Sequence, residues 1–517
     1  MVFGDIVRKY SRLCPHRPAV LFEGTTIRWG ELNERANRLG NALLRLGVEK
    51  GDRVAFISKN CHQFFDVWFA LAKGGFAGIT PNFRLSSKEF LYILQDAGAK
   101  VVIVSHEFGD KIKEIASGLD TVRSIIGLNG EHGFDLDYAD LLSESSPEEP
   151  STKVDENDVR LIMYTSGTTG KPKGAIWTHR SSLTPFPDLV IAAGCKRSDI
   201  NMNIIPMCLA GGTMTSNTFA YCGALNVAVK DFDPVSVFRT IQEDKVTATT
   251  MVPTIIIALL NHPERARYDL SSLQKIIYGS APISPEVLEQ AMDAFKSDFV
   301  QAYGATETNA FSGYLYPEDH VLDGSERSRR RIASAGYEAL WAQQRVVNEN
   351  GEDVAPGEVG EIRIKGDGVI KEYWKAPEKT ADSIRDGWWH SGDLATVDED
   401  GYIYIVDRKI DMIISGAMNI YSREVEDVLY EHSAIEHAVV IGVPDEEWGE
   451  SVKAVIQLKP GWEVTETQII DHCLKYLADY KKPRSIDFVR EMPMSSAGKI
   501  LKRVIREEYW KGRERKV

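Results

Sequence analysis

Apolar runs of strand length alternate with amphipathic helical patterns through the first part of the chain. Residues 54–57 and 101–104 are uninterrupted apolar runs, which is typical of buried strands. Residues 32–46 instead carry apolar side chains at helical spacing. Because strands that alternate with helices are typical of α/β proteins, we predict a large N-terminal α/β domain with layered sheets over residues 1–406.

The pattern starts again near the C-terminus, after a short strand pattern at residues 402–406 and the charged segment 407–411. The apolar positions beyond this segment predict a helix at 424–429, strands at 438–441 and 452–458, and an amphipathic helix that includes 469–477. We therefore predict a small α+β domain over residues 412–517, joined to the first domain by a hinge at residues 407–411.

Composition and charge narrow the class of protein. The 517 residues are enough for more than one domain, and the net charge of −14 argues against nucleic acid or an anionic membrane as the main partner. The six cysteines are scattered without a CxxC pair, as expected of reduced thiols in the cytoplasm. No apolar run is long enough to span a bilayer. We expect a cytoplasmic protein without a transmembrane segment, and both a monomer and a homodimer remain open.

The strongest chemical signal is the sequence Tyr-Thr-Ser-Gly-Thr-Thr-Gly-Lys-Pro-Lys-Gly at residues 164–174. Its glycines let backbone N–H groups approach an anion, and its hydroxyls and ammonium groups add donors and positive charge. This composition predicts a phosphate-binding loop. It is not a Walker A loop, because Pro172 stands where Ser or Thr should follow Gly170 and Lys171. Strand-like flanks at residues 159–163 and 175–177 predict that the loop joins strand to strand.

Residues 165–174 resemble the phosphate loop of the adenylate-forming superfamily, which includes acyl-CoA synthetases, non-ribosomal peptide synthetase adenylation domains and firefly-type luciferases. The resemblance extends along nearly the whole chain, through several motifs in the family's order. It implies activation of a carboxylic acid by ATP and Mg²⁺ as an acyl-adenylate, transfer of the acyl group to the thiol of CoA, and rotation of the C-terminal domain between these half-reactions. It assigns ATP binding to Thr165, Ser166, Gly167, Thr168, Thr169, Gly170 and Lys173, of which Thr165 and Lys173 are also predicted to be catalytic.

Further motifs imply the rest of the nucleotide site. Tyr303, Gly304, Thr306 and Glu307 match the family's YGxTE motif, in which Glu307 is a catalytic residue and the Mg²⁺ ligand and Thr306 lies beside the α-phosphate. Gly279, Ser280, Ala281 and Pro282 resemble the segment that packs against adenine. Asp393, in a close match to GWFHTGD, and Arg408 correspond to the residues that contact the ribose.

The family's terminal GKI motif is matched at residues 498–500. By this resemblance Lys499 reaches the carboxylate and the α-phosphate, where a point charge lowers the barrier to adenylate formation. Lysines and arginines in a basic C-terminal tail are usually solvated, and we expect this of Lys502, Arg506 and Lys511.

The CoA site is implied by four further positions and one loop. Residues 414–421 match the loop that swings in after adenylation, in which the backbone of Gly416 passes close to the thiol arm. Arg84, Lys482 and Arg484 stand where some relatives hold the nucleotide phosphates of CoA, and Trp448 where an aromatic ring packs on it.

The chain departs from the family at the acyl pocket and at the hinge. Cys208 and Leu209 replace the aromatic residue and the histidine that often gate the pocket. The hinge position usually occupied by Asp or Lys is Ile410, so the pivot is expected at Lys409 or Asp411. The residues expected to line the acyl pocket are Met207, Leu209, Gly211, Gly212 and Met214.

Three functions compete. An amino-acid adenylation enzyme that loads a carrier protein generally needs an acidic residue to pair with the substrate amine, and residues 201–230 contain no Asp or Glu. A relative without catalysis is disfavoured because Lys499, Glu307 and Asp393 all carry the side chains that the chemistry needs. We therefore predict an AMP-forming acyl-CoA synthetase, an acid–thiol ligase for a fatty, aromatic or cyclic acid. A stand-alone adenylation enzyme that loads an amino or other carboxylic acid onto a carrier protein is the alternative.

Overall fold

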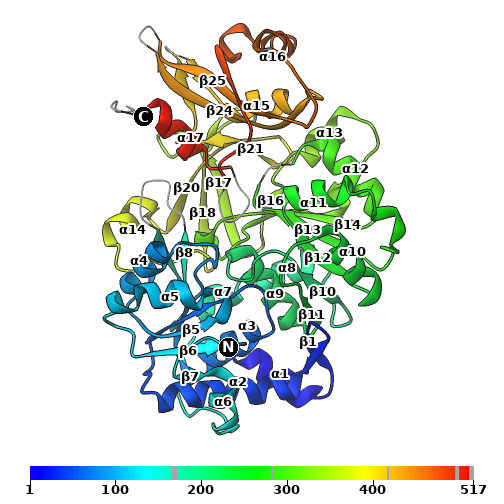
Figure 1. Cartoon of the computed structure of the whole chain (residues 1–517). Helices are drawn as coiled ribbons and strands as arrows, with labels where there is room; N and C mark the ends of the chain where they lie inside the picture. Colours follow the sequence, from blue (N-terminus) through cyan, green and yellow to red (C-terminus); the bar gives the residue numbers. More distant parts are fainter. Residues whose placement is uncertain (166–171, 282, 416–417, 446–447, 495–499, 512–517) are drawn as a thin grey trace. The chain divides into compact units, whose positions relative to one another are not determined.

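The computed structural model describes the chain except for residues 166–171, 282, 416–417, 446–447, 495–499 and 512–517 (Figure 1). It divides into two compact units, Met1–Gln344 with Ile364–Trp389 and Arg345–Arg363 with His390–Val517. Layered sheets and helices confirm the predicted α/β class. The domain boundaries and the hinge at residues 407–411 stay a prediction.

The larger sheet of the first unit contains nine strands among the described residues. Its central strands are parallel, so their carboxyl ends meet at one edge, where ligands bind in open α/β sheets. The strand order is β16 (Tyr337–Glu338), β15 (Gly313–Leu315), β14 (Asp298–Tyr303), β13 (Lys275–Gly279), β12 (Ala248–Met251), β10 (Ile200–Asn203), β11 (Leu225–Ala228), β1 (Pro18–Phe22) and β2 (Thr25–Arg28).

Three helices cover one face of this sheet, α10 (Pro234–Glu243), α11 (Pro253–Leu260) and α12 (Pro285–Phe295) (Figure 1). Each begins with a proline, whose fixed φ and missing N–H suit the first helical position. Their apolar faces pack on residues from β10, β12, β13 and β14.

A second sheet of the first unit contains seven strands within the described part of the chain, and the predicted phosphate loop lies between its last two. The prediction that the loop joins strand to strand is confirmed, because β8 and β9 are antiparallel and Thr165 stands opposite Lys173. The strand order is β7 (Leu136–Asp137), β6 (Ser124–Leu128), β5 (Ala99–Ser105), β3 (Arg53–Ile57), β4 (Ala77–Ile79), β8 (Val159–Thr165) and β9 (Lys173–Thr178).

The remaining helices of the first unit pack around these two sheets, except α14, which contacts the strand Ile384–Arg385 of another sheet. One of them, α3, is buried along its whole length, consistent with its apolar sequence. The helices are α1 (Asp5–Leu13), α2 (Trp29–Arg45), α3 (Gln63–Gly74), α4 (Ser87–Ala97), α5 (Gly109–Ile115), α6 (Tyr138–Ser143), α7 (His179–Leu183), α8 (Phe186–Ala192), α9 (Ala210–Cys222), α13 (Glu326–Ile332) and α14 (Pro377–Ser383).

The second unit contains most strands of one sheet and all strands of another. The first of these sheets has the order β17 (Ala342–Val347), β18 (Gly360–Gly366), β20 (Trp388–Val397) and β19 (Ile384–Arg385), and β21 (Ile403–Arg408) pairs with β20. The second has the order β23 (Met418–Ile420), β22 (Ile413–Ser415), β25 (Gly449–Leu458) and β24 (Ile435–Asp445), and β26 (Ser485–Val489) pairs with β25.

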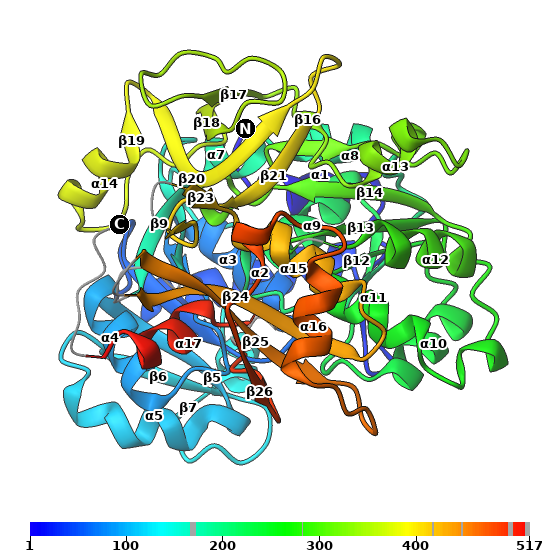
Figure 2. The same ribbon diagram turned by 90° about the horizontal axis from the view of Figure 1, so that it is seen from above.

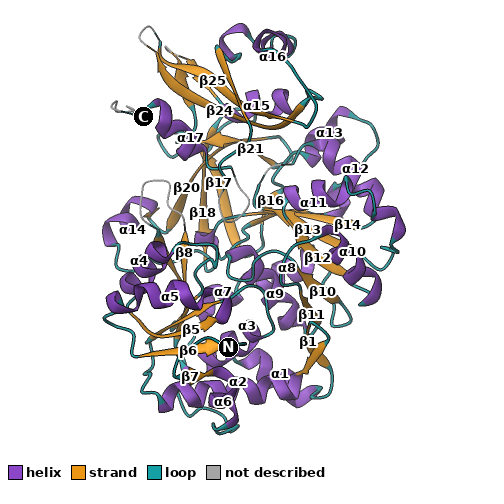
Figure 3. Ribbon diagram, viewed as in Figure 1, coloured by secondary structure: helices purple, strands orange, loops and turns teal. Residues whose placement is uncertain are grey.

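Helices cover both faces of this last sheet (Figure 2, Figure 3). Ala438 and Val440 of β24 pack with α15 (Ser422–Tyr430) and α16 (Glu466–Cys473), whereas Val439 and Ile441 pack with Ile505 of α17 (Lys502–Tyr509). Because successive side chains of a strand point to opposite faces, α17 lies on the face opposite α15 and α16. The predicted strands and the helix at 424–429 are confirmed, whereas the second predicted helix ends at Cys473 and does not extend to residue 477.

Two general expectations can be compared with the structure. All six cysteines, each of them in the described part of the chain, are free thiols. Among the described residues, no helix is both long and apolar enough to cross a membrane.

Candidate active site

Three predicted segments begin where parallel strands of the nine-stranded sheet end. Residues 204–212 follow β10, residues 279–282 complete and follow β13, and residues 303–307 complete and follow β14. Since β12 alone separates β10 from β13, the acyl, adenine and metal segments emerge at one edge of the sheet. The fold therefore brings together motifs that span about a hundred residues of the sequence, from residue 204 to residue 307.

Two glycines are required at this edge by close backbone contacts. A Cβ atom on Gly279 would lie 2.2 Å from the carbonyl oxygen of Ala302, and one on Gly304 would lie 2.0 Å from that of Ala310. The next residue after Gly279, Ser280, is exposed and has a φ of +67°, in the left-handed region. Ala281 is half-buried, and Pro282 lies outside the described residues.

A buried pair, Tyr278 and His320, supports the end of β13. The Tyr278 hydroxyl lies 2.9 Å from His320 Nε2, and His320 Nδ1 lies 2.7 Å from the carbonyl oxygen of Tyr316. A carbonyl only accepts, so Nδ1 carries the proton and Nε2 accepts from the tyrosine. Burial lowers the pKa of His320 to about 4, which keeps the ring neutral. Neither residue belongs to a motif that marks it in the sequence.

Glu307 is a half-buried carboxylate on a short 3₁₀ turn (Thr306–Thr308). Its Oε1 accepts a hydrogen bond of 2.7 Å from the hydroxyl of Tyr373, and its backbone oxygen accepts one of 2.8 Å from the N–H of Ile370. The indole of Trp177 donates to the carbonyl oxygen of Thr306 at 2.8 Å. These contacts fix both the turn and the direction of the carboxylate.

Tyr373 lies between Glu307 and the base of the predicted phosphate loop. The ammonium of Lys173 is 5.5 Å from the centre of the Tyr373 ring, and Ala175 pairs with Tyr373 through the backbone. The N–H of Trp374 donates to the carbonyl oxygen of Gly174 at 2.7 Å. The structure thus brings both Lys173 and Glu307 to the side chain of Tyr373, a residue that no motif in the sequence marks.

Helix α4 forms hydrogen bonds with the β8–β9 hairpin that carries the predicted phosphate loop. The hydroxyl of Tyr164 donates to Asp96 Oδ2 at 2.5 Å, and that of Tyr92 donates to the carbonyl oxygen of Pro172 at 3.2 Å. The indole of Trp374 donates to the carbonyl oxygen of Asp96 at 3.0 Å. The five loop residues Ser166, Gly167, Thr168, Thr169 and Gly170 lie outside the described residues.

The donor set fits Mg²⁺ better than a metal held in an all-protein cage. Among the described residues, no group of three or more His, Cys, Asp or Glu could hold a metal ion. Mg²⁺ is commonly bound by one or two carboxylates together with phosphate oxygens and water. Glu307 is a hard oxygen ligand whose orientation is fixed by Tyr373, so it fits this role.

The predicted acyl segment has an interior side and a partly exposed side. Met207 and Met214 are buried, and a Cβ atom on Gly212 would lie 2.2 Å from the carbonyl oxygen of Pro206. Leu209 and Gly211 are half-buried, and a Cβ atom on Gly211 would lie 4.0 Å from Ser280 Oγ. Leu209 and Gly211 are therefore the members of this set best placed to meet a substrate beside the adenine segment.

The buried side chains of Asn60 and Thr80 form hydrogen bonds with the backbone of this segment. The Asn60 amide nitrogen donates to the carbonyl oxygens of Asn203, Ile205 and Val229 at 3.0–3.2 Å, and its oxygen accepts from the N–H of Met207 at 2.7 Å. Cys208 is buried, which raises the pKa of its thiol to about 12, and its carbonyl oxygen accepts from Thr80. No local sequence signal identifies Asn60, because every partner lies more than a hundred residues away.

In the second unit, the two predicted ribose ligands face each other. Asp393 on β20 stands opposite Arg408 on β21, and the two side chains form an ion pair. The carboxylate side chain is 8% exposed and the arginine side chain 52% exposed. The antiparallel register therefore places a shielded carboxylate beside an accessible guanidinium.

The residues predicted for CoA are partly brought together. The guanidinium of Arg484 lies 5.3 Å from the centre of the Trp448 ring, and both residues are exposed. The ammonium of Lys482 is 2.6 Å from a carboxylate oxygen of Asp479. In the first unit, exposed Arg84 lies over the ring of Phe83 at 4.9 Å. Gly416 and Lys499 lie outside the described residues.

The expectation of solvated basic residues near the C-terminus is wrong for two of the three. Lys502 and Arg506 have side chains only 21% and 11% exposed, and each forms an ion pair. Lys511 is exposed, as expected. The difference arises because the first two lie on the inner side of α17, which packs on β24.

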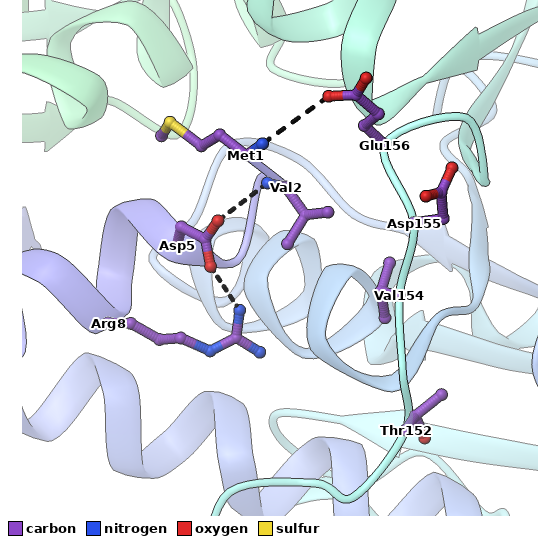
Figure 4. A pocket seen from close by; sticks show the side chains of 8 residues that line it. All are labelled: Met1, Val2, Asp5, Arg8, Thr152, Val154, Asp155 and Glu156. Atoms are coloured by element: carbon purple, nitrogen blue, oxygen red, sulfur yellow. Dashed lines mark hydrogen bonds and ion pairs between the residues drawn. The ribbon is translucent and has the colours of Figure 1, made fainter.

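A hollow near the N-terminus contains none of the predicted site residues (Figure 4). Its charged groups are already paired, Arg8 with Asp5 at 2.8 Å and the Met1 amine with Glu156 at 3.7 Å. The residues that line it are Met1, Val2, Asp5, Arg8, Thr152, Val154, Asp155 and Glu156. It is distinct from the edge of the sheet at which the predicted motifs meet.

Comparison with known proteins gives the same assignment as the motifs. The sequence profile of the AMP-binding enzyme family matches residues 7–374, and that of the AMP-binding enzyme C-terminal domain matches residues 424–499. A feruloyl-CoA synthase from Amycolatopsis sp is 37% identical over 512 residues, which cover 96% of this chain and 97% of the relative.

Two further relatives cover nearly the whole chain. The fatty acid–[acyl-carrier-protein] ligase ScoC of Streptomyces coeruleorubidus is 33% identical over 510 residues, 97% of this chain and 95% of the relative. The crystal structure of the anthranilate CoA ligase AuaEII in complex with anthranoyl-AMP has a TM-score of 0.90 at 27% identity, covering 98% of this chain and 97% of that one. The chain is therefore an enzyme of the AMP-binding family, which confirms the adenylate-forming superfamily that its motifs predicted.

Proposed function

We propose that this enzyme is an AMP-forming acyl-CoA synthetase for an apolar carboxylic acid, either fatty or aromatic. The observation that carries the proposal is the meeting of the acyl, adenine and metal segments at the carboxyl ends of β10, β13 and β14. The relatives are named for feruloyl, fatty acid and anthranilate substrates, which supports a substrate acid with an apolar tail. The reaction releases pyrophosphate in the first half and AMP in the second.

In the first half-reaction, the site must bring two anions together. Thr165, Lys173 and the loop between them bind the phosphates, with Thr306 beside the α-phosphate, and Glu307 holds Mg²⁺, which neutralises phosphate charge when bound. The ring of Tyr373 orients Glu307 and lies beside Lys173. Asp393 and Arg408 take the ribose, and Lys499 stabilises the charge that develops as the acyl-adenylate forms.

In the second half-reaction, the acyl group passes to the thiol of CoA. Trp448, Lys482, Arg484 and Arg84 are the candidates for its nucleotide, and Gly416 for the thiol arm. The pairing of Trp448 with Arg484 offers a flat cationic surface, which suits a base beside a phosphate. We further propose that residues 412–517 rotate about the hinge at residues 407–411 between the two halves.

A carrier protein is the alternative acceptor. The specific observation that favours it is the relative ScoC, a fatty acid–[acyl-carrier-protein] ligase of 33% identity. An exposed Trp448 would then meet a pantetheine arm without the CoA nucleotide. The two acceptors share the same adenylate and differ only in the second half-reaction.

We place the enzyme in the cytoplasm, since its six thiols are free, and we leave a homodimer as a proposal. Fractionation of cells and light scattering of the purified protein test these two points.

The deciding experiment is a panel of carboxylic acids assayed with ATP and Mg²⁺. Pyrophosphate release identifies the acids that are activated, and mass analysis with either CoA or a pantetheinylated carrier protein identifies the acceptor. Long-chain and aromatic acids should release pyrophosphate well above acetate, and CoA should be acylated. Pyrophosphate release with amino acids alone would contradict the proposal, and acylation of the carrier alone would replace CoA as acceptor.

A further inference from the structure

The helix that follows the predicted catalytic lysine is held by buried charges. Lys502, the first residue of α17, has its ammonium 2.7 Å from Glu426 Oε1 and 2.8 Å from Ser422 Oγ, both on α15. Burial alone would lower the pKa of Lys502, but the carboxylates of Glu426, Asp411 and Asp407 outweigh it, so the pKa lies above its ordinary value. Lys502 is therefore charged in the folded protein.

The partners of Lys502 are themselves fixed. Glu426 also accepts a hydrogen bond of 2.7 Å from the N–H of Val440 on β24, the last strand in the sheet order. Ser422 donates through its N–H and its hydroxyl to the carboxylate of Asp407, at 2.5 and 3.1 Å. Since α15 and α17 lie on opposite faces of the sheet, Lys502 joins them around the edge strand.

One turn further along α17, Arg506 reaches the predicted hinge. Its guanidinium lies 2.7 Å from Asp411 Oδ1 and 3.1 Å from the carbonyl oxygen of Ile410. Both side chains of the ion pair are largely buried, at 11% and 16% exposure. Asp411 is one of the two positions at which the sequence analysis expects the pivot, so the end of the hinge is bonded directly to α17.

The chain just before α17 is also tied to a preceding segment by backbone hydrogen bonds. Met494 and Ile500 form a backbone bridge, and the N–H of Leu501 donates to the carbonyl oxygen of Pro493 at 2.8 Å. Ile505 packs in the core beneath β24. The residue before Ile500 in the sequence is Lys499, so the chain is anchored immediately on its C-terminal side.

From these contacts we infer that Lys502 and Arg506 are positioning residues for adenylate formation, which bind α17 to α15 and to residues 410–411. The inference rests on the proposed role of Lys499. Replacing a buried ion pair by apolar residues of similar volume is often neutral or stabilising, so we assign these pairs to fixing the orientation of α17 rather than to stabilising the fold. The two pairs therefore hold α17, which follows Lys499 in the sequence, in a set relation to the end of the hinge.

Four variants on one helix test this. Lys502→Met and Arg506→Met remove the charges and keep the apolar stems, whereas Arg503→Met removes an exposed arginine that pairs with Glu507 on the same helix. Adenylate formation is measured by ATP–pyrophosphate exchange, and acyl transfer by supplying the acyl-adenylate with CoA. Both charge-removing variants should lower the kcat of exchange about tenfold or more with the KM for ATP unchanged. Acyl transfer and the Arg503→Met control should be unaffected, and Arg506→Lys should recover most of the loss.

The alternative outcomes separate this inference from the proposed function. Equal losses in both half-reactions, or unchanged exchange in both variants, would overturn the positioning role. If Lys502→Met does not fold, Glu426→Gln removes the charged partner of Lys502 at nearly constant volume, and it must reduce exchange but not transfer. Lys499→Ala is measured beside them: if it retains exchange, the proposed catalytic lysine fails, whereas if it alone loses exchange, only the positioning role fails.

Discussion

Glu307 in the first unit and Lys502 in the second are both partly buried charged side chains, but their hydrogen-bond partners differ in charge. Glu307 accepts a hydrogen bond from the neutral phenol of Tyr373. Lys502 is enclosed by the carboxylate of Glu426 and the hydroxyl of Ser422, with the carboxylates of Asp407 and Asp411 nearby.

The difference follows from what each charge is expected to do. A carboxylate that must accept a metal ion needs lone pairs and negative charge, and a phenol can orient it without neutralising it. A charge that only holds a helix in place is best neutralised, because an uncompensated buried charge is costly. The charge of the partners therefore distinguishes the two roles: neutral partners suit a side chain that binds a ligand, and partners of opposite charge suit one that stabilises the position of a helix.

The largest expected effect tests the second unit. Lys499→Ala should reduce adenylate formation by about two to three orders of magnitude, because it removes a preorganised positive charge from the reacting centre. Transfer of the acyl group from a supplied acyl-adenylate to CoA should be retained, since the proposed domain rotation would take the lysine away from the site for that step. The two half-reactions are measured separately, and an equal loss in both would contradict the account with two conformations.

The next largest effects are expected in the first unit, from changing either partner of the hydrogen bond between Tyr373 and Glu307. Glu307→Gln should reduce pyrophosphate release by about a hundredfold even at saturating Mg²⁺, because the metal loses its anionic ligand. Tyr373→Phe leaves the carboxylate and removes only its orientation, so we expect a loss of about tenfold that added Mg²⁺ partly restores. Titration of both variants with Mg²⁺ checks this. Full activity in Glu307→Gln would show that Glu307 only caps its turn.

A smaller effect concerns the neutral framework of the first unit and its dependence on pH. The folded-state pKa of His320, about 4, lies below its ordinary value of 6.5, so the unfolded chain takes up the proton first as the pH falls. The contribution of His320 is present in full above pH 6.5 and is lost progressively between pH 6.5 and pH 4. Lowering the pH from 7 to 5 should cost about 2 kcal/mol of unfolding free energy through this residue.

Denaturant unfolding at both pH values measures this cost, and His320→Gln is the variant to compare. Its unfolding free energy should fall less between pH 7 and pH 5 than that of the parent protein. His179 is also buried, with its pKa lowered to about 3, and it stays in both proteins as a common background. Identical pH dependences would show that His320 is not the group that titrates.

The smallest effect concerns the acyl segment. Leu209 is half-buried and Cys208 is buried, so Leu209→His should change the substrate path more than Cys208→Phe. The second substitution would force an aromatic ring into a space that is already filled. The parent protein should prefer longer apolar acids by up to about 1 kcal/mol per buried methylene until the pocket is full. Leu209→His should move the optimum toward smaller acids. The measurement is kcat/KM over a series of chain lengths, and an unchanged profile would exclude Leu209 from the acyl path.

Contiguous motifs and the local periodicity of apolar residues were enough to predict the family and many of the strands and helices. The strand flanks of residues 164–174, the elements of the C-terminal domain and the family itself were all evident from segments a few residues long. Such features are set by backbone conformation and by burial on one face, which neighbouring residues decide together. The positions of Asp393 and Arg408 opposite each other followed once their strands paired.

What only the tertiary structure decided is which side chains from distant segments meet. Tyr373 is 66 residues from Glu307, and Lys502 is 80 residues from Ser422, so no local pattern marks either pair. Lys502 and Arg506 look like solvated residues of a basic tail, because burial of a charge depends on carboxylates that other strands and helices supply. Sequence determined the chemistry that the chain carries, and the packing of remote elements determined which of its charges face a ligand and which hold the fold.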